Sequence, residues 1–520
     1  MAKSKCIFLL KSITYTDYSM KSKTRMIPSF SFKSTSFSAL LFLFFLFSCQ
    51  NEKKEFLALD ISLLEAVHEQ YQEKSITERR FKHAQAMPLV KGRLDGHFVV
   101  EEIGKSVEGK EIFQMTIGDG PTKVMLWSQM HGNESTATMA LFDLFNFLEA
   151  KDDDFEDLRN TLKSKLTLRF IPMVNPDGMD NWTRRNAFDI DLNRDAIKQT
   201  SPEAIVLKNA RDNFSPAFGF NLHDQQVYYN VSQTEKPATI SVLAPAYNYA
   251  TEVNDVRKNA MQVIVGMNRV LQQIVPGQVG KYDDAFEPRA FGDNFQKWGT
   301  STILIESGGY KDDPEKQYIR KLNFIIILNA LSEIANGSHD QYVLEDYYKI
   351  PDNDLKLMDL ILKNLALVKN ETNYGVDLGI RRREADANDS FFVNGTIDDL
   401  GDLSVFYGFE EFDAAGMEVV QGKIYETSFK NPEEITMEKS IELLKKGFLG
   451  VKVIESLDRQ SHAFPILLLK NKTEIPTGIE MGGSPNFFLA KDGKLKYAVV
   501  NGYLIDLENP ATQSYRQKVM

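Results

Sequence analysis

The sequence predicts an α/β fold, a mixed, mostly parallel sheet with helices on both faces, followed by a β-rich module at the C-terminal end. Between about residues 98 and 340, short apolar segments alternate with segments of helical periodicity. Such alternation is typical of parallel sheets that are covered on both faces. Beyond about residue 350 short strand-like segments dominate, which indicates a second module. A length of 520 residues is sufficient for about two to four domains.

The charge and the cysteine content exclude several classes of protein. The chain has 61 Lys and Arg against 72 Asp and Glu, a net charge of −11, so it lacks the basic composition of a nucleic-acid-binding protein. Its two cysteines cannot form a disulfide framework or a thiolate zinc site. Any metal ion must therefore be bound by carboxylates and by some of the seven histidines.

Residues 1–48 have the features of an export signal of the lipoprotein type. A positively charged segment precedes the apolar run Phe37–Phe47, which is shorter than the roughly 18–20 residues of a membrane-spanning helix and fits the core of a signal peptide. Residues 46–49 (Leu-Phe-Ser-Cys) resemble a bacterial lipobox, in which the cysteine becomes the lipidated first residue. We therefore expect an exported protein of the bacterial cell envelope, facing the periplasm or the cell surface, with membrane attachment through a lipid on Cys49.

The elements of the α/β domain are predicted in chain order. Residues 49–79 are expected to form a polar tether and an N-terminal helix, with helical spacing over 57–78. Residues 80–345 are expected to form the α/β domain itself. Its predicted strands are 123–130, 166–174, 218–222 and 300–305, and its predicted helices are 135–150 and 319–336.

Residues 350–520 are expected to form the β-rich module, whose role the sequence does not indicate. A helix is predicted over 355–368. The remaining predicted elements are strands at 390–397, 403–412 and 417–427, a helix at 432–446, and further strands around 451, 466 and 487. Residues 491–494 (Lys-Asp-Gly-Lys) predict a hairpin turn between 487–490 and 495–500. No catalytic constellation is evident in the sequence of this module.

Two histidines and a glutamate are candidate metal ligands. His131 follows the predicted strand 123–130, and Glu134 lies three residues on at the start of a helix, so both side chains can converge on one ion. Such a pair alone is as often a solvated turn. His223 also ends an apolar strand, and ligands of open α/β sheets bind outside the carboxyl ends of strands. Catalytic zinc commonly has three protein ligands and one open position for water. The other histidines have the surroundings of surface or packing residues: His68, His83, His97, His339 and His462.

Glu306 and an arginine-rich segment complete the candidate site. Glu306 directly follows four apolar residues of a predicted strand, where a carboxylate is costly to bury without a partner. Beside a metal-bound water it could act as general base, although a capping or salt-bridged glutamate is an equal alternative in isolation. Arg184, Arg185 and Arg194 follow the Asn-Pro-Asp-Gly turn at 175–178. Because arginine binds carboxylates and stabilises oxyanions, these residues indicate an anionic substrate unless the segment is a solvated loop.

The order of these motifs resembles the zinc carboxypeptidase family of the carboxypeptidase A type. The motifs are His131-x-x-Glu134, Asn-Pro-Asp-Gly, Arg184-x-Asn-Ala, Asp-Leu-Asn193-Arg194, His223 and Glu306. The resemblance covers residues 80–340, and segment 103–110 is also similar to a strand of the family. It implies a zinc carboxypeptidase-like catalytic domain over 80–345 that binds one zinc ion per chain. The implied substrate is a peptide with a free C-terminal carboxylate, and cell-wall peptides are one candidate.

The resemblance also implies which residues bind zinc and which one acts as the base. His131, Glu134 and His223 would bind zinc, and Glu306 would be the general base that activates the attacking water.

Further residues acquire roles in substrate binding from the same resemblance. Arg184 would stabilise the oxyanion, with the adjacent Arg185 as the alternative. Asn193 and Arg194 would bind the terminal carboxylate of the substrate. Tyr282, which lies 24 residues before Glu306, is the nearest candidate for the tyrosine that closes over the substrate.

The sequence departs from the family in three places. Asp195 stands where an Asn commonly follows the Asn-Arg pair, and no local motif identifies the closing tyrosine. Asp224, directly after His223, is unusual and is a candidate for contacting the metal ligands. The pocket for the departing side chain is expected around 290–293, where Asp293 would favour a basic residue and Phe291 an apolar one.

Two alternatives to a carboxypeptidase stay open on the sequence alone. One is a zinc-dependent amide deacylase of the aspartoacylase-like type, whose metal motif also has the pattern His-Gly-x-Glu. The other is a surface lipoprotein that binds glycan or protein through its β-rich module and carries a degenerate enzyme domain. The Asn-Pro-Asp-Gly turn and Glu306 before Gly-Gly favour the carboxypeptidase over the deacylase.

Overall fold

The structure is a computed structural model that describes residues 59–94, 96–387, 390–456, 459–470, 474–511 and 515–520. The expected export signal and the expected lipid site at Cys49 lie outside these ranges. Within them, no helix combines the length and the apolar character needed to cross a membrane.

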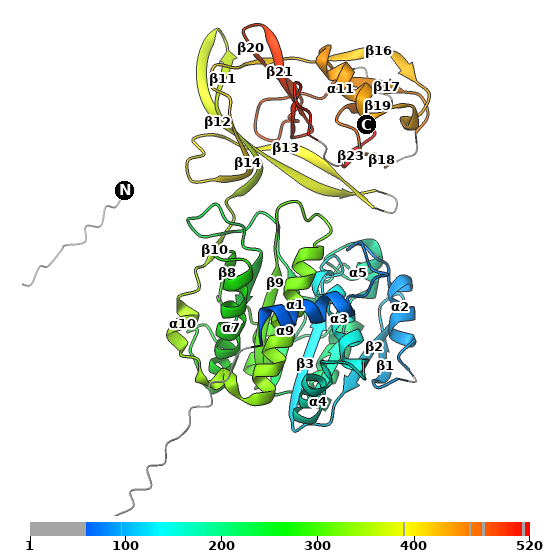
Figure 1. Ribbon diagram of the computed structural model, residues 1–520, viewed down its shortest axis with the longest axis vertical. Coiled ribbons are helices and arrows are strands. Elements are labelled where there is room, and N and C mark those ends of the chain that lie inside the picture. Colours follow the sequence, from blue (N-terminus) through cyan, green and yellow to red (C-terminus); the bar gives the residue numbers. More distant parts are fainter. Residues whose placement is uncertain (1–58, 95, 388–389, 457–458, 471–473, 512–514) are drawn as a thin grey trace, which may run out of the picture. The chain divides into compact units, whose positions relative to one another are not determined.

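A mixed sheet forms the framework of the α/β domain (Figure 1). Its strands are β1 (Val99–Lys105), β2 (Glu111–Ile117), β3 (Thr122–Ser128), β4 (Leu166–Ile171), β5 (Phe218–Asp224), β7 (Ile240–Leu243), β8 (Val279–Lys281) and β9 (Ser301–Ser307). They lie in the order β1-β2-β4-β3-β5-β9-β7-β8. The central strands β4, β3, β5 and β9 are parallel, whereas the pairs β1–β2, β2–β4 and β7–β9 are antiparallel. The predicted fold class is confirmed.

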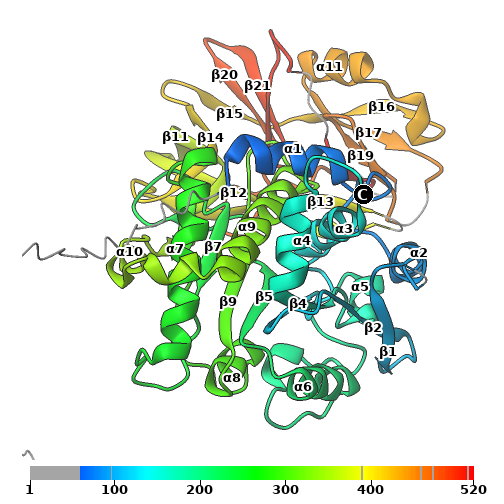
Figure 2. The same ribbon diagram turned by 60° about the horizontal axis from the view of Figure 1, so that its bottom comes forward.

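Helices cover both faces of this sheet. They include α3 (Thr136–Glu149), α6 (Pro202–Phe214), α7 (Asp255–Ile274), α8 (Phe291–Lys297) and α9 (Gln317–Asn336). Successive side chains of a strand point to opposite faces. In β3, Val124 and Leu126 therefore pack in the core with α3, α7 and α9, whereas Met125 and Trp127 pack in a second core with α6 and α8. In Figure 2, α6 and α8 lie at the bottom of the view, away from α3 and α9.

The candidate site residues lie at the carboxyl ends of three neighbouring strands. His131 comes three residues after the end of β3, His223 is the penultimate residue of β5, and Glu306 is the penultimate residue of β9. Since β3, β5 and β9 are adjacent and parallel, their ends meet at one edge of the sheet. This edge is where the sequence predicted the site.

The turn after β3 packs closely against the Asn-Pro-Asp-Gly segment. A Cβ atom on Gly132 would lie 1.9 Å from the backbone carbon of Gly178, so a side chain at this position has no space. The amide of Gly178 donates a hydrogen bond to Asn175 Oδ1 at 2.9 Å. Asp177 Oδ1 accepts a hydrogen bond from Ser106 Oγ at 2.8 Å, which ties segment 103–110 to the same turn. These contacts fix the backbone that carries His131.

The N-terminal helix is shorter than predicted. The helix α1 (Ile61–Tyr71) ends well before residue 78. After α1, the backbone amide and carbonyl of Glu73 form hydrogen bonds with side chains of α3 and α9. The Glu73 amide donates to Asp143 Oδ1 at 2.7 Å, and Arg320 Nη2 donates to the Glu73 carbonyl at 2.9 Å. These buried polar side chains compete for groups that a longer helix would use internally.

The C-terminal module is rich in strands, as predicted. Its larger sheet contains β11 (Leu357–Lys369), β12 (Thr372–Asp386), β13 (Phe391–Gly401), β14 (Tyr407–Asp413), β15 (Glu418–Val420), β20 (Phe487–Lys491), β21 (Lys494–Val500) and β22 (Tyr503–Asp506). A smaller parallel sheet contains β16 (Lys423–Phe429), β17 (Phe448–Val453) and β19 (Leu467–Leu469), against which α11 (Met437–Lys445) packs. The predicted hairpin is confirmed, with positive φ angles of 51° at Asp492 and 73° at Gly493 in its turn.

The helix predicted over 355–368 is wrong, because this segment is the strand β11. It pairs with β12 on one side and with β14 on the other. Leu360 and Leu362 enter one core cluster of the module, while Met358 and Ile361 enter another. A strand with apolar residues on both faces lacks the alternation of a half-exposed strand, so its leucine-rich sequence resembles a helix.

Candidate active site

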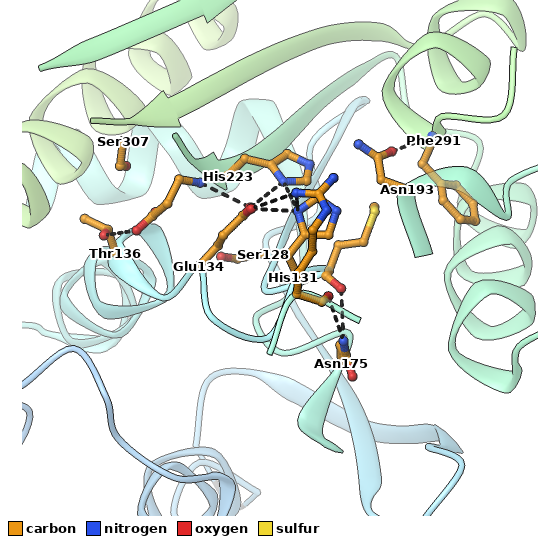
Figure 3. A network of polar contacts seen from close by, with 12 residues as sticks. Ser128, His131, Glu134, Thr136, Asn175, Asn193, His223, Phe291 and Ser307 are labelled. Atoms are coloured by element: carbon orange, nitrogen blue, oxygen red, sulfur yellow. Dashed lines mark hydrogen bonds and ion pairs between the residues drawn. The ribbon is translucent and has the colours of Figure 1, made fainter. Parts of the chain in front are cut away.

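Three side chains converge at the carboxyl edge of the sheet (Figure 3). His131 Nδ1 lies 2.8 Å from Glu134 Oε1 and 3.1 Å from His223 Nδ1. Glu134 Oε2 lies 2.7 Å from His223 Nδ1. All three side chains are buried, and one possible ligand atom of each lies within 4.8 Å of the others. The structure thus brings the three predicted metal ligands together.

This set of donors fits zinc. Two imidazole nitrogens and a carboxylate lie close together, and zinc commonly takes such ligands together with one open position. Asp191 Oδ1 lies 3.1 Å from His131 Nε2, so the second ring nitrogen is engaged and Nδ1 is directed at the cluster. Asp191 belongs to the Asp-Leu-Asn-Arg motif of the sequence, but nothing in the motif assigned it a role at the metal ligands.

Burial and the neighbouring charges act differently on the protonation of the three ligands. Burial raises the pKa of Glu134, but His131 and His223 outweigh this effect and lower it, so the carboxylate is ionised as a ligand must be. Burial lowers the pKa of His223, which keeps its imidazole neutral. Burial also lowers the pKa of His131, but the carboxylates of Glu134 and Asp191 raise it above its ordinary value.

Glu306 lies beside His223 because of the register between β5 and β9. The two residues are direct partners in the parallel pairing, so their side chains project to the same side of the sheet. Among the described residues, the carboxylate of Glu306 has no hydrogen-bond or ion-pair partner, and it lines the cavity above the cluster. Burial, followed by the negative charges of Glu134 and Asp224, raises its pKa well above the ordinary value. The chain therefore places an unengaged carboxylate next to the metal site.

Tyr282 also lines this cavity. Burial raises its pKa, and the nearby charge of Glu306 raises it further. The ring centroids of Tyr282 and Tyr229 are 5.9 Å apart. Tyr229 was not among the predicted site residues, because nothing local distinguishes a tyrosine in the loop after His223.

The side chains of the adjacent residues Arg184 and Arg185 have different partners. Arg184 Nη1 lies 3.3 Å from Glu134 Oε1, and Arg184 Nε donates to Asp191 Oδ2 at 3.0 Å. Arg185 Nη1 instead donates to the carbonyl of Asp189 at 2.8 Å on an exposed loop. Arg184 therefore faces the metal site and Arg185 does not.

The segment after Asp191 positions a second cationic group at the cavity. The side chains of Asn193 and Arg194 both line the cavity. Asn193 Oδ1 accepts a hydrogen bond from the amide of Phe291 at 2.9 Å, and Arg194 Nε lies 3.2 Å from Glu287 Oε2. Asp195, the departure noted in the sequence, accepts from the amide of Ser201 at 2.8 Å and so shapes the loop.

The segment 290–293 contributes an acidic group to the cavity. Phe291 is fully buried in the core of α8, where its ring centroid lies 6.1 Å from that of Phe295. Asp293 lines the cavity, and its Oδ1 accepts a hydrogen bond from the amide of Glu287 at 2.9 Å. Burial raises the pKa of Asp293 to about 7. Of the two residues considered for side-chain selection, Asp293 is the one that reaches the cavity.

Asp224 connects the ligand cluster to a buried lysine. Its backbone amide donates to Glu134 Oε2 at 3.2 Å. Its Oδ2 accepts from Thr136 Oγ1 at 2.5 Å and from Lys316 Nζ at 3.0 Å. Asp224 thus contacts a metal ligand, as the sequence suggested. Lys316, in contrast, has no motif that could have identified it.

The remaining histidines have the surroundings expected of packing or surface residues. Four are buried: His68, His83, His339 and His462. His97 is exposed. None of these five lies in the cluster with His131 and His223.

Comparisons with known proteins agree with this site. A family model described as "Zinc carboxypeptidase" matches residues 86–257, a range that includes the three ligands and Arg184 but ends before Glu306. An uncharacterized protein of Zymomonas mobilis is 29% identical over 135 residues, covering 25% of this chain and 35% of that protein. Human carboxypeptidase D is 27% identical over 154 residues, covering 25% of this chain and 11% of that protein. The chain thus spans about a third or less of the length of these curated relatives.

Solved structures of metallo-carboxypeptidases are among the similar folds. One from Burkholderia cenocepacia has a TM-score of 0.40 at 17% identity and covers 50% of this chain and 70% of that chain. Carboxypeptidase A from Helicoverpa armigera has a TM-score of 0.39 at 15% identity and covers 54% of this chain and 82% of that chain. Residues 86–257 of this chain are thus similar to the zinc carboxypeptidase family, and the three candidate ligands lie within the matched range.

Proposed function

We propose that this protein is a zinc-dependent carboxypeptidase that hydrolyses the C-terminal bond of a peptide with a free carboxylate. The observation that carries the proposal is the parallel register that sets Glu306 beside His223, at the edge where His131 and Glu134 also lie. An unengaged carboxylate next to three metal ligands is the arrangement that hydrolysis by an activated water needs.

Glu306 carries the proton transfers of this reaction. Zinc, when bound, lowers the pKa of water and polarises the scissile carbonyl. Glu306 takes the proton of the attacking water and then gives it to the leaving amine. Burial favours the protonated form of Glu306, which helps it to hold the proton between these two steps.

The arginines of the cavity bind the substrate and stabilise the charge that develops on it. Arg184, whose guanidinium lies beside Glu134, stabilises the oxyanion formed from the scissile carbonyl. Asn193 and Arg194 bind the terminal carboxylate. Tyr282, near Glu306, closes over the bound peptide.

The acidic group at Asp293 selects the departing residue. It lies on the cavity wall next to the loop of Arg194 and Glu287. An ionised carboxylate there favours a C-terminal Lys or Arg over an apolar residue. Phe291, which would have favoured an apolar residue, faces the core.

Metal content combined with peptide hydrolysis tests this function. The full-length protein is expected to bind one zinc ion and to release a single C-terminal residue from a peptide. Glu306→Gln should retain zinc and lose activity by about 10²- to 10⁴-fold, because it removes the general base but no ligand. Glu345→Gln, at an exposed position of the short helix 344–348, is the matched control and should leave both unchanged.

Two results would contradict the proposal. One is a folded wild-type protein that binds no zinc. The other is a Glu306→Gln variant with the activity of the wild type.

We also propose that the protein is exported and attached to the membrane through a lipid on Cys49, where cell-wall peptides would be accessible as substrates. The lipobox-like segment 46–49 after an apolar run supports this location. Metabolic labelling with a palmitate analogue should label the wild type and the Cys6→Ala variant, but not Cys49→Ala. Label that survives Cys49→Ala would contradict the anchor.

A further inference from the structure

The cavity above the metal site has walls from two parts of the chain. Its volume is 1540 Å³. The α/β domain contributes the ligands and the residues around them. The C-terminal module contributes a second wall, whose residues include Asp359, Arg382, Phe409, Glu410 and Tyr503. The module therefore bounds the space in which a substrate would lie.

The first set of contacts between the α/β domain and the module lies in the chain segment directly after β5, the strand that carries His223. After β5, the short strand β6 (Asn230–Val231) pairs with β10 (Asn353–Asp354) at the start of the module. Tyr228 Oη donates to Asp359 Oδ2 at 2.8 Å, and the Tyr228 carbonyl accepts from the amide of Leu357 at 3.1 Å. The loop that leaves His223 is thereby joined to the module wall.

A second attachment lies near the loop that carries Arg184. Arg80 Nη2 lies 3.0 Å from Glu384 Oε2 of the module. Its guanidinium lies 4.8 Å from the ring centroid of Trp182 and 4.6 Å from that of Phe391. Two separate sets of contacts therefore hold the module wall against the cavity.

Most charged side chains of the module wall already have partners. Asp359 accepts from Tyr228 and from Arg382, and Glu384 pairs with Arg80. Glu410 differs, because its side chain has no hydrogen bond or ion pair to any residue that the structure describes. The residue is exposed and lines the cavity. An exposed carboxylate of the cavity wall that has no partner in the chain is available to a cationic group of a ligand.

The direction of the bound peptide places its amino-terminal part against this wall. In the proposed function, Asn193 and Arg194 would bind the terminal carboxylate; Asn193 Oδ1 accepts from the Phe291 amide and Arg194 pairs with Glu287. The scissile carbonyl would then lie beside His131, Glu134 and His223. The part of the peptide before the scissile bond must occupy the remaining space of the cavity, where Glu410 lies.

We propose that the C-terminal module makes the enzyme selective for short peptides with a free amino terminus, and that Glu410 binds their terminal ammonium group. This inference rests on the carboxypeptidase activity proposed above. A residue that binds one end of the peptide, combined with a metal site that acts near the other end, sets a preferred peptide length.

A series of peptides tests this proposal with the full-length, zinc-loaded protein. The peptides run from two to six residues, share one C-terminal pair, and are each prepared with a free and with an acetylated amino terminus. We expect one short length to be preferred, and acetylation to lower kcat/KM at that length by about tenfold, the size of one charged contact. Glu410→Gln should lower kcat/KM for the free peptide to the level of the acetylated one, and should leave the acetylated peptide unaffected.

Glu411→Gln is the matched control. Glu411 is adjacent on β14 and does not line the cavity, and its Oε2 lies 2.5 Å from Lys363 Nζ. The Glu411→Gln variant should prefer the free over the acetylated peptide to the same extent as the wild type. The proposal is overturned if the wild type cleaves free and acetylated peptides equally at every length, or if Glu410→Gln lowers both to the same extent. If the zinc-loaded wild type cleaves no peptide of any length, the proposed function itself fails.

Discussion

The α/β domain and the C-terminal module contribute to one cavity in different ways. In the domain, His131, His223 and Glu306 come from the ends of adjacent parallel strands, so the sheet alone brings them together. In the module, residues of the cavity wall such as Asp359, Arg382 and Glu410 lie on different strands, which only the pairing of the larger sheet brings together. The positions of the candidate catalytic residues are therefore fixed by local strand order, whereas the positions of the wall residues of the module depend on long-range packing.

The largest expected difference between the two regions concerns their buried histidines. His223→Gln should abolish zinc binding and peptide hydrolysis together, because it removes one of three ligands. His462→Gln alters a buried histidine of the module and should leave the zinc content at one per chain. Metal analysis of both purified variants checks this prediction, and loss of zinc in His462→Gln alone would contradict it.

A smaller effect is expected from the residue that orients His131. Asp191→Asn should weaken zinc binding by about 10- to 100-fold, because the carboxylate that engages His131 Nε2 is lost. Asp189→Asn, on the exposed part of the same loop, is the control and should bind zinc like the wild type. Competition with a chelator measures both affinities. Equal affinities for the two variants would show that Asp191 does not support the metal site.

The preference for a basic C-terminal residue should depend on pH. Burial raises the pKa of Asp293 to about 7, so its carboxylate is mostly ionised above pH 7 and mostly neutral below it. The ratio of kcat/KM for C-terminal Arg over C-terminal Leu should therefore rise through pH 7, by an amount on the order of tenfold. Asp293→Asn should give a low ratio that does not change with pH. Taking the ratio within one enzyme cancels the titration of Glu306, and a ratio in the wild type that does not depend on pH would exclude this role of Asp293.

The smallest expected effect concerns the attachment of the module. Glu384→Gln should lower the free energy of unfolding by about 1 kcal/mol or less, because Glu384 is partly exposed where it pairs with Arg79 and Arg80. Burial raises the pKa of Glu384, but these arginines outweigh it and lower the pKa. The pair therefore contributes stability above the ordinary pKa of Glu, and the contribution is lost as the pH falls. Urea unfolding of both proteins at neutral and acidic pH should show the difference only at neutral pH.

Much of the domain could be predicted because its signals are local. The apolar strands and the helix of α9 were found within a few residues, and the three ligands follow from two strand ends and one turn. The residues alone do not distinguish Arg184 from Arg185; only the resemblance to the zinc carboxypeptidases favoured Arg184, which is the arginine that the loop directs at the metal site. The same holds for Asp293 and Phe291, which lie in one turn of α8 and point to different surroundings.

Less of the module could be predicted, because its strands are stabilised by distant partners. The segment now seen as β11 contains leucines that suit a helix, and only its pairing with β12 and β14 makes it a strand. The role of Glu410 in the cavity wall was also beyond the sequence. No local motif marks Glu410 as a cavity residue, because only the folded structure brings its strand to the cavity of the metal site.

The central claim is that the zinc site removes one residue from the carboxyl end of a peptide. Mass spectrometry of products from a matched pair of peptides, one with a free and one with an amidated C-terminus, tests it most directly. We predict release of the single C-terminal residue from the free peptide and at least about 100-fold slower cleavage of the amide, because Arg194 then has no carboxylate to bind. Equal cleavage of both peptides, internal cleavage, or faster hydrolysis of an N-acyl amino acid than of any peptide would contradict it.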